Sequence, residues 1–324
     1  MRKMKYAAAI CETLDEEMAR DKNVLMIGED VGFIGGNFKC SEGLLNKYGD
    51  LRMKDSPISE QGFVGMGVGM ALTGLRPVVE LMFSDFSLVA GDQIFNQAAK
   101  IRYMSGGQKT CPLTIRCPIG AGRSSAAQHS QSLQAVAAHF PGIKVVLPST
   151  AQEAAGLLKT AIRDDDPVMF LEHKMEYNKE YEVDDVIEPI PFGKARIARE
   201  GNDITIAATS SMVMKSEAAA EKLAKEGIEC EIIDLRTIVP LDKDSIIKSV
   251  KKTGRLIVAD EGYERCGVGA EIPAAISEDI FYYLDAPCGR VCNPNVPLPF
   301  SPALEFPIIP SADKVYDKVK TYFK

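Results

Sequence analysis

The sequence has few histidines, no long apolar run and none of the common nucleotide-phosphate motifs. Histidine occurs only at positions 129, 139 and 173 of the 324 residues, which argues against a multi-histidine metal site. No segment reaches the roughly 18 uninterrupted apolar residues that a membrane span needs. A GxxxxGKS or GxxxxGKT loop, a GxGxxG after a strand, HExxH and GxSxG are all missing. The chemistry must therefore use few groups or a borrowed cofactor.

The chain also lacks a cluster of basic residues. Lys and Arg number 38 against 45 Asp and Glu, which gives a net charge of −7. A mildly acidic chain without a basic block offers no electrostatic footprint for nucleic acid or for an anionic membrane surface. The 46% hydrophobic and 26% charged residues are typical of a globular protein of this length, for which we expect about two domains.

Cysteine is present but not paired in any recognisable pattern. The eight cysteines are at 11, 40, 111, 117, 230, 266, 288 and 292. The closest two, Cys288 and Cys292, lack the second pair or the histidines of a zinc site. We predict that all eight are reduced and buried, and that the protein works in a reducing compartment, the cytoplasm.

Apolar, β-branched runs alternate with stretches of helical periodicity, the pattern of parallel sheets covered by helices. Thr150 and Glu153 form a capping-box pattern before one such helix. The pattern predicts two doubly wound α/β domains, at 1–175 and 194–324, joined by an exposed linker at 176–193. A proline-rich tail at 293–310 is predicted to wrap the surface without a helix. Strands are expected at 23–29, 76–83, 112–118, 144–149, 167–173, 203–209, 228–237, 254–261 and 289–293.

The segment DSPISEQGFVGMGVGM, residues 55–70, carries the densest signal. Pro57 and Ser59 favour a helix start, which places Glu60 in the first helical turn. Glu60 either stabilises the helix N-terminus as an ordinary charge or is a carboxylate in an apolar, glycine-lined cleft, suited to sharing a proton. Glycines at 62, 65 and 69 recur at helical spacing, and we expect them to let another backbone approach closely.

Two further side chains are candidates. His129, in IGAGRSSAAQHSQSL, lies among small residues at a strand-to-helix transition, a common position for a reactive group in α/β proteins; it can equally be structural. Phe86, in ELMFSDFSLVAG, is either a core residue or a stacking face for a heteroaromatic ring.

Several motifs in order resemble the beta subunits of thiamine-diphosphate-dependent 2-oxo acid dehydrogenase complexes, which act on pyruvate, branched-chain 2-oxo acids or acetoin. The motifs are DSPISEQGF, DQIFNQAAKIRYMSGG, AAQHSQ, PGIKVVLPST, AIRDDDPVMFLEHK, IDLRTIVPLD, GRLIVADE and VPLPFSPALE. The resemblance covers nearly the whole chain. It implies a pyrimidine-binding domain followed by a transketolase C-terminal-like domain.

The resemblance also implies a cofactor and the residues that serve it. Glu60 matches the glutamate that activates thiamine diphosphate through its pyrimidine ring, Phe86 the aromatic residue beside that ring, and Glu29 an acidic residue near the cofactor. His129 matches the histidine that protonates the lipoyl sulfur during reductive acylation. The diphosphate and magnesium would be held by an alpha subunit through a GDG motif, which this chain lacks.

A potassium ion is a further implication, ligated mainly by backbone carbonyls. Of the six positions that match the potassium site, the last in the chain is Asp166, where the family usually has Asn. The resemblance also implies an assembly of two alpha and two beta chains and a lipoylated acyltransferase core, in which the glycines at 62, 65 and 69 would suit subunit packing. The matching potassium positions are Cys111, Leu113, Thr114, Ala161, Asp164 and Asp166.

The sequence leaves two alternatives open. The C-terminal half of a split transketolase has the same two domains and also lacks GDG, and an assembly subunit could dock partners without chemistry. Glu60 and His129 argue against the second. Between substrates, ELMFSDF and DQIFNQAAKIRYM favour the acetoin branch, whereas IGAGRSSAAQHSQ is compatible with pyruvate or branched-chain members.

Overall fold

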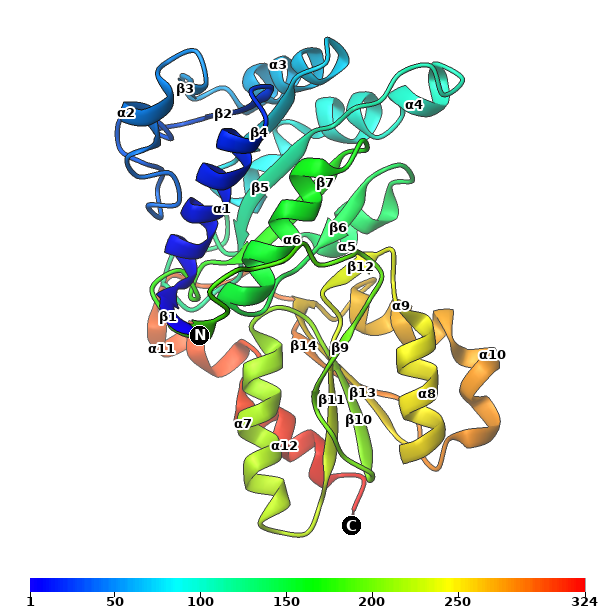
Figure 1. The fold of residues 1–324 in the computed structure, drawn as a ribbon. Coiled ribbons are helices and arrows are strands. Elements are labelled where there is room, and N and C mark those ends of the chain that lie inside the picture. Colours follow the sequence, from blue (N-terminus) through cyan, green and yellow to red (C-terminus); the bar gives the residue numbers. More distant parts are fainter. Residues whose placement is uncertain (324) are drawn as a thin grey trace. The chain divides into compact units, whose positions relative to one another are not determined.

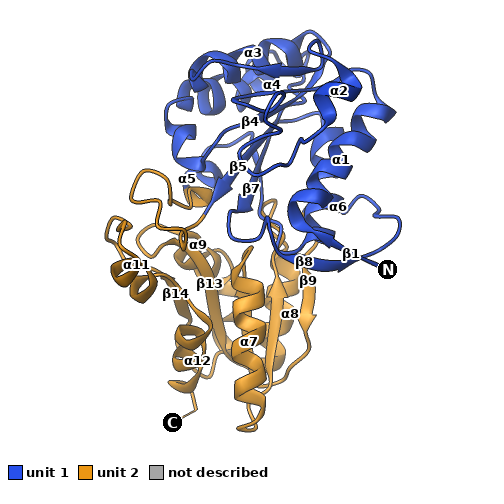
Figure 2. Ribbon diagram, turned by 90° about the vertical axis from the view of Figure 1, so that its left-hand side faces the viewer, with its two compact units in different colours: residues 1–119, 136–192 blue, residues 120–135, 193–324 orange. Residues whose placement is uncertain are grey.

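The computed structural model describes residues 1–323 (Figure 1). Its contacts divide the chain into two compact units, unit 1 at 1–119 and 136–192 and unit 2 at 120–135 and 193–324 (Figure 2). The segment 120–135 therefore groups with unit 2, although it lies inside the span predicted for the first domain. Each unit has an α/β architecture built on a largely parallel sheet, as the alternating pattern predicts.

Six strands of unit 1 pair in the order β6-β7-β5-β4-β2-β3, with every pairing parallel. Most of these strands are buried along their length, because a parallel sheet is covered on both faces and reads as continuous apolar runs. Five of the six are predicted strands, confirmed with ends that shift by up to three residues, and β3 is additional. Their bounds are β2 (Val24–Gly28), β3 (Met53–Asp55), β4 (Arg76–Glu80), β5 (Thr114–Ile119), β6 (Lys144–Val146) and β7 (Val168–His173).

Two helices of unit 1 begin where the sequence predicts, α3 at Glu60 and α6 directly after Thr150. Thr150 caps α6, since its side chain accepts a hydrogen bond from the Glu153 amide at 3.3 Å. The chain also forms a helix near its N-terminus, α1. The bounds are α1 (Tyr6–Arg20), α2 (Leu44–Tyr48), α3 (Glu60–Leu72), the 3₁₀ helix η1 (Ser84–Leu88), the π-helix η2 (Asp92–Ala98), α4 (Ile101–Met104), α5 (Gln134–His139) and α6 (Ala151–Arg163).

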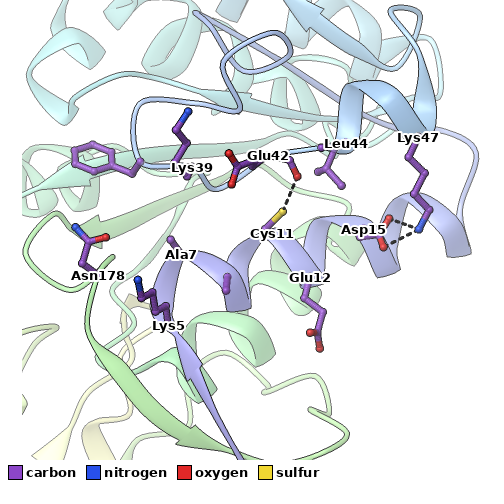
Figure 3. Close-up of a pocket in the computed structure, with 13 residues that line it drawn as sticks. Lys5, Ala7, Cys11, Glu12, Asp15, Lys39, Glu42, Leu44, Lys47 and Asn178 are labelled. Atoms are coloured by element: carbon purple, nitrogen blue, oxygen red, sulfur yellow. Dashed lines mark hydrogen bonds and ion pairs between the residues drawn. The ribbon is translucent and has the colours of Figure 1, made fainter.

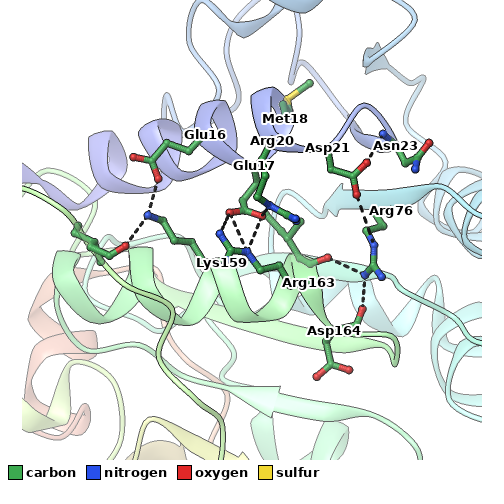
Figure 4. A network of polar contacts seen from close by, with 12 residues as sticks. Glu16, Glu17, Met18, Arg20, Asp21, Asn23, Arg76, Lys159, Arg163 and Asp164 are labelled. Atoms are coloured by element: carbon green, nitrogen blue, oxygen red, sulfur yellow. Dashed lines mark hydrogen bonds and ion pairs between the residues drawn. The ribbon is translucent and has the colours of Figure 1, made fainter.

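Helices α1 and α6 lie side by side and are joined by a polar network (Figure 4). Glu17 is only 1% exposed and accepts hydrogen bonds from Arg163, the shortest 2.6 Å, and from Arg20 at 2.8 Å. Lys159 pairs with Glu16 at 2.5 Å. A buried carboxylate is tolerated here because two guanidinium groups surround it.

The segment predicted as an exposed linker is more structured than expected. It contains β8 (Glu180–Val183), which pairs antiparallel with β1 (Arg2–Lys5), a strand the sequence pattern did not indicate. Tyr177 is 2% exposed and stacks on Phe38 with ring centroids 4.4 Å apart. Glu176, Tyr177, Val183 and Ile187 are buried, whereas the other residues of 176–192 are exposed or half-buried.

Unit 2 holds a five-stranded sheet in the order β14-β13-β10-β11-β9, parallel except for the edge strand β9. Its predicted strands are confirmed, and β9, β12 and α8 are additional. The strands are β9 (Arg196–Arg199), β10 (Ile204–Ala208), β11 (Cys230–Asp234), β12 (Thr237–Val239), β13 (Leu256–Tyr263) and β14 (Gly289–Asn293). The helices are α7 (Met212–Ala224), α8 (Lys243–Thr253), α9 (Val268–Ala275), α10 (Ser277–Ile280), η3 (Phe281–Tyr283), α11 (Pro302–Ile308) and α12 (Ala312–Lys320).

The proline-rich tail does contain a helix, α11, so the prediction of a tail without helix is wrong. Pro302 occupies the first helical turn, where its missing N–H is not needed. Pro307 lies near the end of the helix, which stops at Ile308. Prolines near both ends of a seven-residue helix are therefore compatible with its formation.

The prediction of buried cysteines holds for half of them. All eight are free thiols; Cys40, Cys111, Cys117 and Cys230 are buried, three are half-buried, and Cys266 is exposed. Cys266 is exposed because it lies in a turn with φ of 52° before α9 rather than in a strand. Within residues 1–323, no helix combines the length and apolarity needed to cross a bilayer.

Candidate active site

Glu60 and Glu29 form a pair of buried carboxylates in unit 1. Glu60 is the first residue of α3 and 7% exposed, and Glu29 directly follows β2 and is 6% exposed. Burial raises the pKa of Glu29, and the negative charge of Glu60 raises it further. Two carboxylates that interact in this way favour holding a proton between them.

The backbone around Glu29 is tightly enclosed. A Cβ on Gly28 would come within 2.6 Å of the Glu80 carbonyl oxygen, so only glycine fits between the two strands at this point. Asp30, on the other side of Glu29, has φ of 56°, and the Ser56 amide donates to the Gly28 carbonyl at 2.9 Å. Glu29 is therefore held at the carboxyl end of β2, where ligands bind in open α/β sheets.

One atom of this pair has no hydrogen-bond partner. The Oε1 atom of Glu29 is buried and unpaired among the described residues. A buried acceptor of this kind is costly unless something else satisfies it. An N–H of a bound pyrimidine, from its exocyclic amine or from a protonated ring nitrogen, would donate to this oxygen, which makes the two glutamates a suitable site for such a ring.

Phe86 lies in η1 rather than at a strand end. It is half-buried and meets Phe83 edge to face, with ring centroids 6.0 Å apart. The π-helix η2 follows four residues after Leu88, and π-helical turns occur frequently at functional sites.

The glycines of α3 do not pack as expected within this chain. A Cβ added to Gly69 would have no atom within 4 Å among the described residues, and Gly62 is exposed. The glycine that packs is Gly67, where a Cβ would meet Val79 at 2.7 Å. Within the described residues no other backbone lies against Gly62, Gly65 or Gly69, so packing of this stripe against a second subunit stays a prediction.

Sequence reasoning missed a buried charge cluster behind the site. Arg116 is 2% exposed; it donates two hydrogen bonds to Glu172, at 2.7 and 2.8 Å, and one to Glu80 at 2.6 Å. Tyr177 donates to Glu172 at 2.7 Å. Glu80 also faces the turn after Glu29, since a Cβ on Gly36 would meet its Oε1 at 2.9 Å. No local pattern marks these residues, which lie in separate strands.

The residues expected around potassium are brought together at the amino ends of β5 and β7. The Cys111 amide donates to the Asp165 carbonyl at 3.1 Å and the Val168 amide to the Leu113 carbonyl at 2.9 Å. Thr114 begins β5, and the Ala161 carbonyl accepts from the Asp164 amide at 3.3 Å. Each of these carbonyl oxygens keeps a second lone pair for an ion.

The acidic side chains at this point are already paired. Lys144 contacts the Asp164 carboxylate at 2.6 Å and Asp166 at 3.5 Å, and Arg102 binds Asp166. Arg76 donates to the Asp164 carbonyl at 2.9 Å (Figure 4). Among residues 1–323, no three His, Cys, Asp or Glu side chains gather as a metal-binding group. A cation would therefore depend on backbone oxygens.

His129 belongs to unit 2, within the loop that connects β5 to α5. The loop has several left-handed residues, including Ser124 with φ of 54° and Ala126 with φ of 63°. The His129 amide donates to the Ala126 carbonyl at 3.3 Å, and the imidazole is half-buried. Neighbouring loop residues line a pocket of about 510 Å³ with Tyr263, Arg265 and Asn295. Of the other histidines, His139 ends α5 and His173 is buried in β7.

A groove of about 720 Å³ in unit 1 contains none of the predicted site residues (Figure 3). Lys47 pairs there with Asp15 at 2.6 Å. The Cys11 thiol donates to the Glu42 carbonyl at 3.5 Å, and burial raises the pKa of this thiol. Its charges are balanced and its cysteine is not activated, so the groove is not a candidate for the chemistry.

Both halves of the chain match models of known domain families. Residues 2–180 match the transketolase pyrimidine binding domain, and residues 193–315 match the transketolase C-terminal domain. A solved split-gene transketolase, an inactive beta4 tetramer, superposes with a TM-score of 0.80 over 98% of this chain and 97% of its own, at 22% identity. That likeness shows the shared fold alone.

Sequence relatives are much closer. The chain is 48% identical to the beta subunit of the pyruvate dehydrogenase E1 component of Rickettsia felis, over 96% of each chain. It is also 48% identical to the beta subunit of acetoin:2,6-dichlorophenolindophenol oxidoreductase of Cupriavidus necator, over 97% of this chain and 96% of that one. The chain therefore belongs to the family of E1 beta subunits of pyruvate and acetoin dehydrogenases, and it is a subunit of an oxidoreductase.

Proposed function

We propose that this chain, with an alpha subunit, forms a thiamine-diphosphate-dependent dehydrogenase for acetoin or pyruvate that acylates lipoyl groups on an acyltransferase core. The observation that carries the proposal is the buried pair of Glu29 and Glu60, with an unpaired Glu29 oxygen, in a domain that matches the pyrimidine-binding family. We propose the same composition as the family, two alpha and two beta chains.

In this proposal the pyrimidine ring binds beside Glu60 and Phe86. When bound, thiamine diphosphate supplies the nucleophilic carbon and the electron sink for cleavage of the substrate. Glu60 would exchange a proton with the ring nitrogen, and Glu29 would accept a hydrogen bond from the ring or hold the proton that Glu60 gives up. The alpha subunit would hold the diphosphate and magnesium.

His129 would act in the second half of the reaction. The acyl carbon bonds to one sulfur of the lipoyl disulfide, the S–S bond takes up two electrons and breaks, and the other sulfur leaves as a thiolate. We propose that His129 protonates this sulfur, a task for which histidine is suited because it ordinarily titrates near neutrality. His129 is half-buried and lies in the loop between β5 and α5.

A potassium ion at the amino ends of β5 and β7 completes the proposal. The ion would be held mainly by backbone carbonyls, from Cys111, Leu113, Thr114, Ala161, Asp164 and Asp166. The carboxylates of Asp164 and Asp166 are already paired with Lys144 and Arg102. The ion would therefore order the loop through backbone oxygens and would not serve to neutralise unpaired carboxylates.

The experiment that tests the function is co-purification. The tagged chain is isolated from its own host, and the proteins that accompany it are identified. The expected result is an alpha chain with a GDG motif together with a lipoylated acyltransferase, and activity with acetoin or pyruvate. A GDG-bearing partner without any lipoylated protein would favour a split transketolase instead. A chain that binds thiamine diphosphate tightly when alone would refute the shared site.

A further inference from the structure

The loop that carries His129 is held by three acidic side chains from much later in the chain. Near its start, the Ala121 amide donates to Glu261 Oε1 at 2.7 Å. Near its end, Gln134 Nε2 donates to Asp260 Oδ1 at 2.8 Å. Both acids lie in β13, and each is at most 3% exposed. The two ends of the loop are thus attached to one strand of unit 2.

The middle of the loop is held by a third carboxylate, Glu305. The Gly122 amide donates to Glu305 Oε1 and the Ser124 amide to Glu305 Oε2, each at 2.9 Å. Hydrogen bonds from backbone amides to a carboxylate are about twice as strong as neutral ones. Because Glu305 is 0% exposed, water does not compete for either oxygen.

This contact coincides with strained backbone. Gly122 has φ of 97°, which glycine adopts readily, but Ser124 has φ of 54°. A non-glycine residue in that region costs of order 1–3 kcal/mol and persists only when its surroundings hold it there. Glu305 supplies that support, since it binds the Ser124 amide directly. The next left-handed residue, Ala126, accepts the hydrogen bond from the His129 amide at 3.3 Å.

Glu305 is itself firmly placed. It lies in the first turns of α11, and its amide donates to the Ser301 carbonyl at 2.8 Å. Ala121, Leu298 and Ile309 form a small apolar cluster next to it. Lys215 connects Glu261 at 2.9 Å with the Pro310 carbonyl at 3.0 Å, just after α11. The acids that hold the loop therefore belong to one connected framework.

We propose that Glu305 is a positioning residue for His129: it sets the backbone of residues 122–126 and so places the imidazole for proton transfer to the lipoyl sulfur. The inference rests on the proposed role of His129. Glu305 itself touches no reacting atom. It acts through the loop, although it lies 176 residues after His129 in the sequence.

The test uses the assembled enzyme with Glu305→Gln, which keeps the side-chain shape but presents an amide N–H₂ to one of the two backbone donors. Reductive acylation of a lipoylated domain is measured beside substrate-driven reduction of an artificial dye, which bypasses the lipoyl step. We expect the first rate to fall by about 10- to 100-fold, the effect of a small misplacement, with dye reduction unchanged. Glu278→Gln, at an exposed glutamate of unit 2, is the matched control and should change neither rate.

Two further measurements separate positioning from general damage. Hydrogen exchange of peptides that cover residues 120–129 should speed up in Glu305→Gln, with peptides from β10 unaffected. In the His129→Ala background, Glu305→Gln should add little further loss, because both changes act on one step. Glu305→Asp, which keeps the charge but is one methylene shorter, provides a milder variant if Glu305→Gln does not fold.

The outcomes distinguish this inference from the proposed function. An equal fall in both rates, a full additional loss in the His129→Ala background, or unchanged reductive acylation in Glu305→Gln would overturn the positioning role. If His129→Ala itself keeps reductive acylation, the proposed role of His129 fails, and the inference fails with it. Loss of reductive acylation with unchanged dye reduction, in His129→Ala and in Glu305→Gln, supports both the proposed role of His129 and the positioning role of Glu305.

Discussion

Glu29 and Glu60 are like-charged neighbours in unit 1, and the charge of Glu60 adds to the effect of burial in raising the pKa of Glu29. The protonated form of Glu29 is therefore favoured more than it is for a glutamate in water. The relationship has a thermodynamic consequence that is measurable without the cofactor.

The first prediction concerns stability and pH. Because the pKa of Glu29 is higher in the folded than in the unfolded chain, the folded state binds more protons between the two values. The free energy of unfolding therefore falls as pH rises from the ordinary glutamate range through the raised pKa. Glu29→Gln should flatten this part of the profile. Urea unfolding between pH 4 and 8 measures it, and an unchanged slope would contradict the assignment.

The second prediction concerns cofactor activation. Glu60→Gln cannot exchange a proton with the pyrimidine, so we expect the exchange rate of the thiazolium C2 proton in the assembled enzyme to fall by about 10²- to 10⁴-fold. Binding of the alpha subunit should not change. Exchange is followed by quenching in D₂O and NMR. Glu12→Gln, at a partly exposed glutamate of α1, serves as control; a normal exchange rate in Glu60→Gln would exclude the proposed role.

The third prediction separates the two half-reactions. His129→Ala should keep substrate-dependent dye reduction but lose reductive acylation by about 10²-fold or more, since we propose that His129 acts as a general acid in the second step alone. His139→Ala is the comparison, because His139 ends α5 and has no assigned role. Equal losses in both assays would show that His129 does not act at the lipoyl sulfur.

The fourth prediction concerns the buried charge cluster. Arg116→Met would leave the Glu172 and Glu80 carboxylates without their cation, and breaking a buried pair in this way costs about 3–5 kcal/mol. Lys222→Met removes the exposed pair with Asp313 and should cost about 0–1 kcal/mol. Thermal or urea unfolding compares the two variants. A loss for Arg116→Met as small as that of the control would mean that the cluster contributes little.

The fifth prediction concerns potassium. If the carbonyls near β5 and β7 hold the ion, potassium chloride should raise the midpoint of thermal unfolding more than sodium or choline chloride at equal ionic strength. The gain is about 2.7 kcal/mol when the ion is at 100 times its dissociation constant. Identical midpoints in the three salts would argue that the Lys144 and Arg102 pairs alone organise this loop.

Much of the fold follows from local signals. The Thr150 cap, the Ser59–Glu60 helix start and the apolar strands are encoded in a few adjacent residues, and the structure bears them out. The elements that the sequence did not predict depend on partners far away in the chain. Strand β1 exists because β8 pairs with it, and α11 forms although its prolines argue against a helix.

The same holds for the site: local sequence patterns mark some of its residues and not others. Glu60 stands out because it lies at a predicted helix start that is followed by glycines at helical spacing, whereas Glu305 is one glutamate among many until its two backbone donors are seen. Arg116 likewise sits in a strand that reads as apolar, and its partners come from two other strands. Positioning residues are therefore the part of a site that sequence patterns reveal least.

The placement of residues 120–135 also bears on how this protein can be divided. The chain passes between the units three times, at Ile119/Gly120, Ala135/Val136 and Phe192/Gly193. A gene cut at the last junction would release a fragment whose histidine loop has been separated from the three acids that hold it. When the two units are expressed separately or fused to other proteins, residues 120–135 should therefore stay with residues 193–324. A single cut in the chain does not separate the two units.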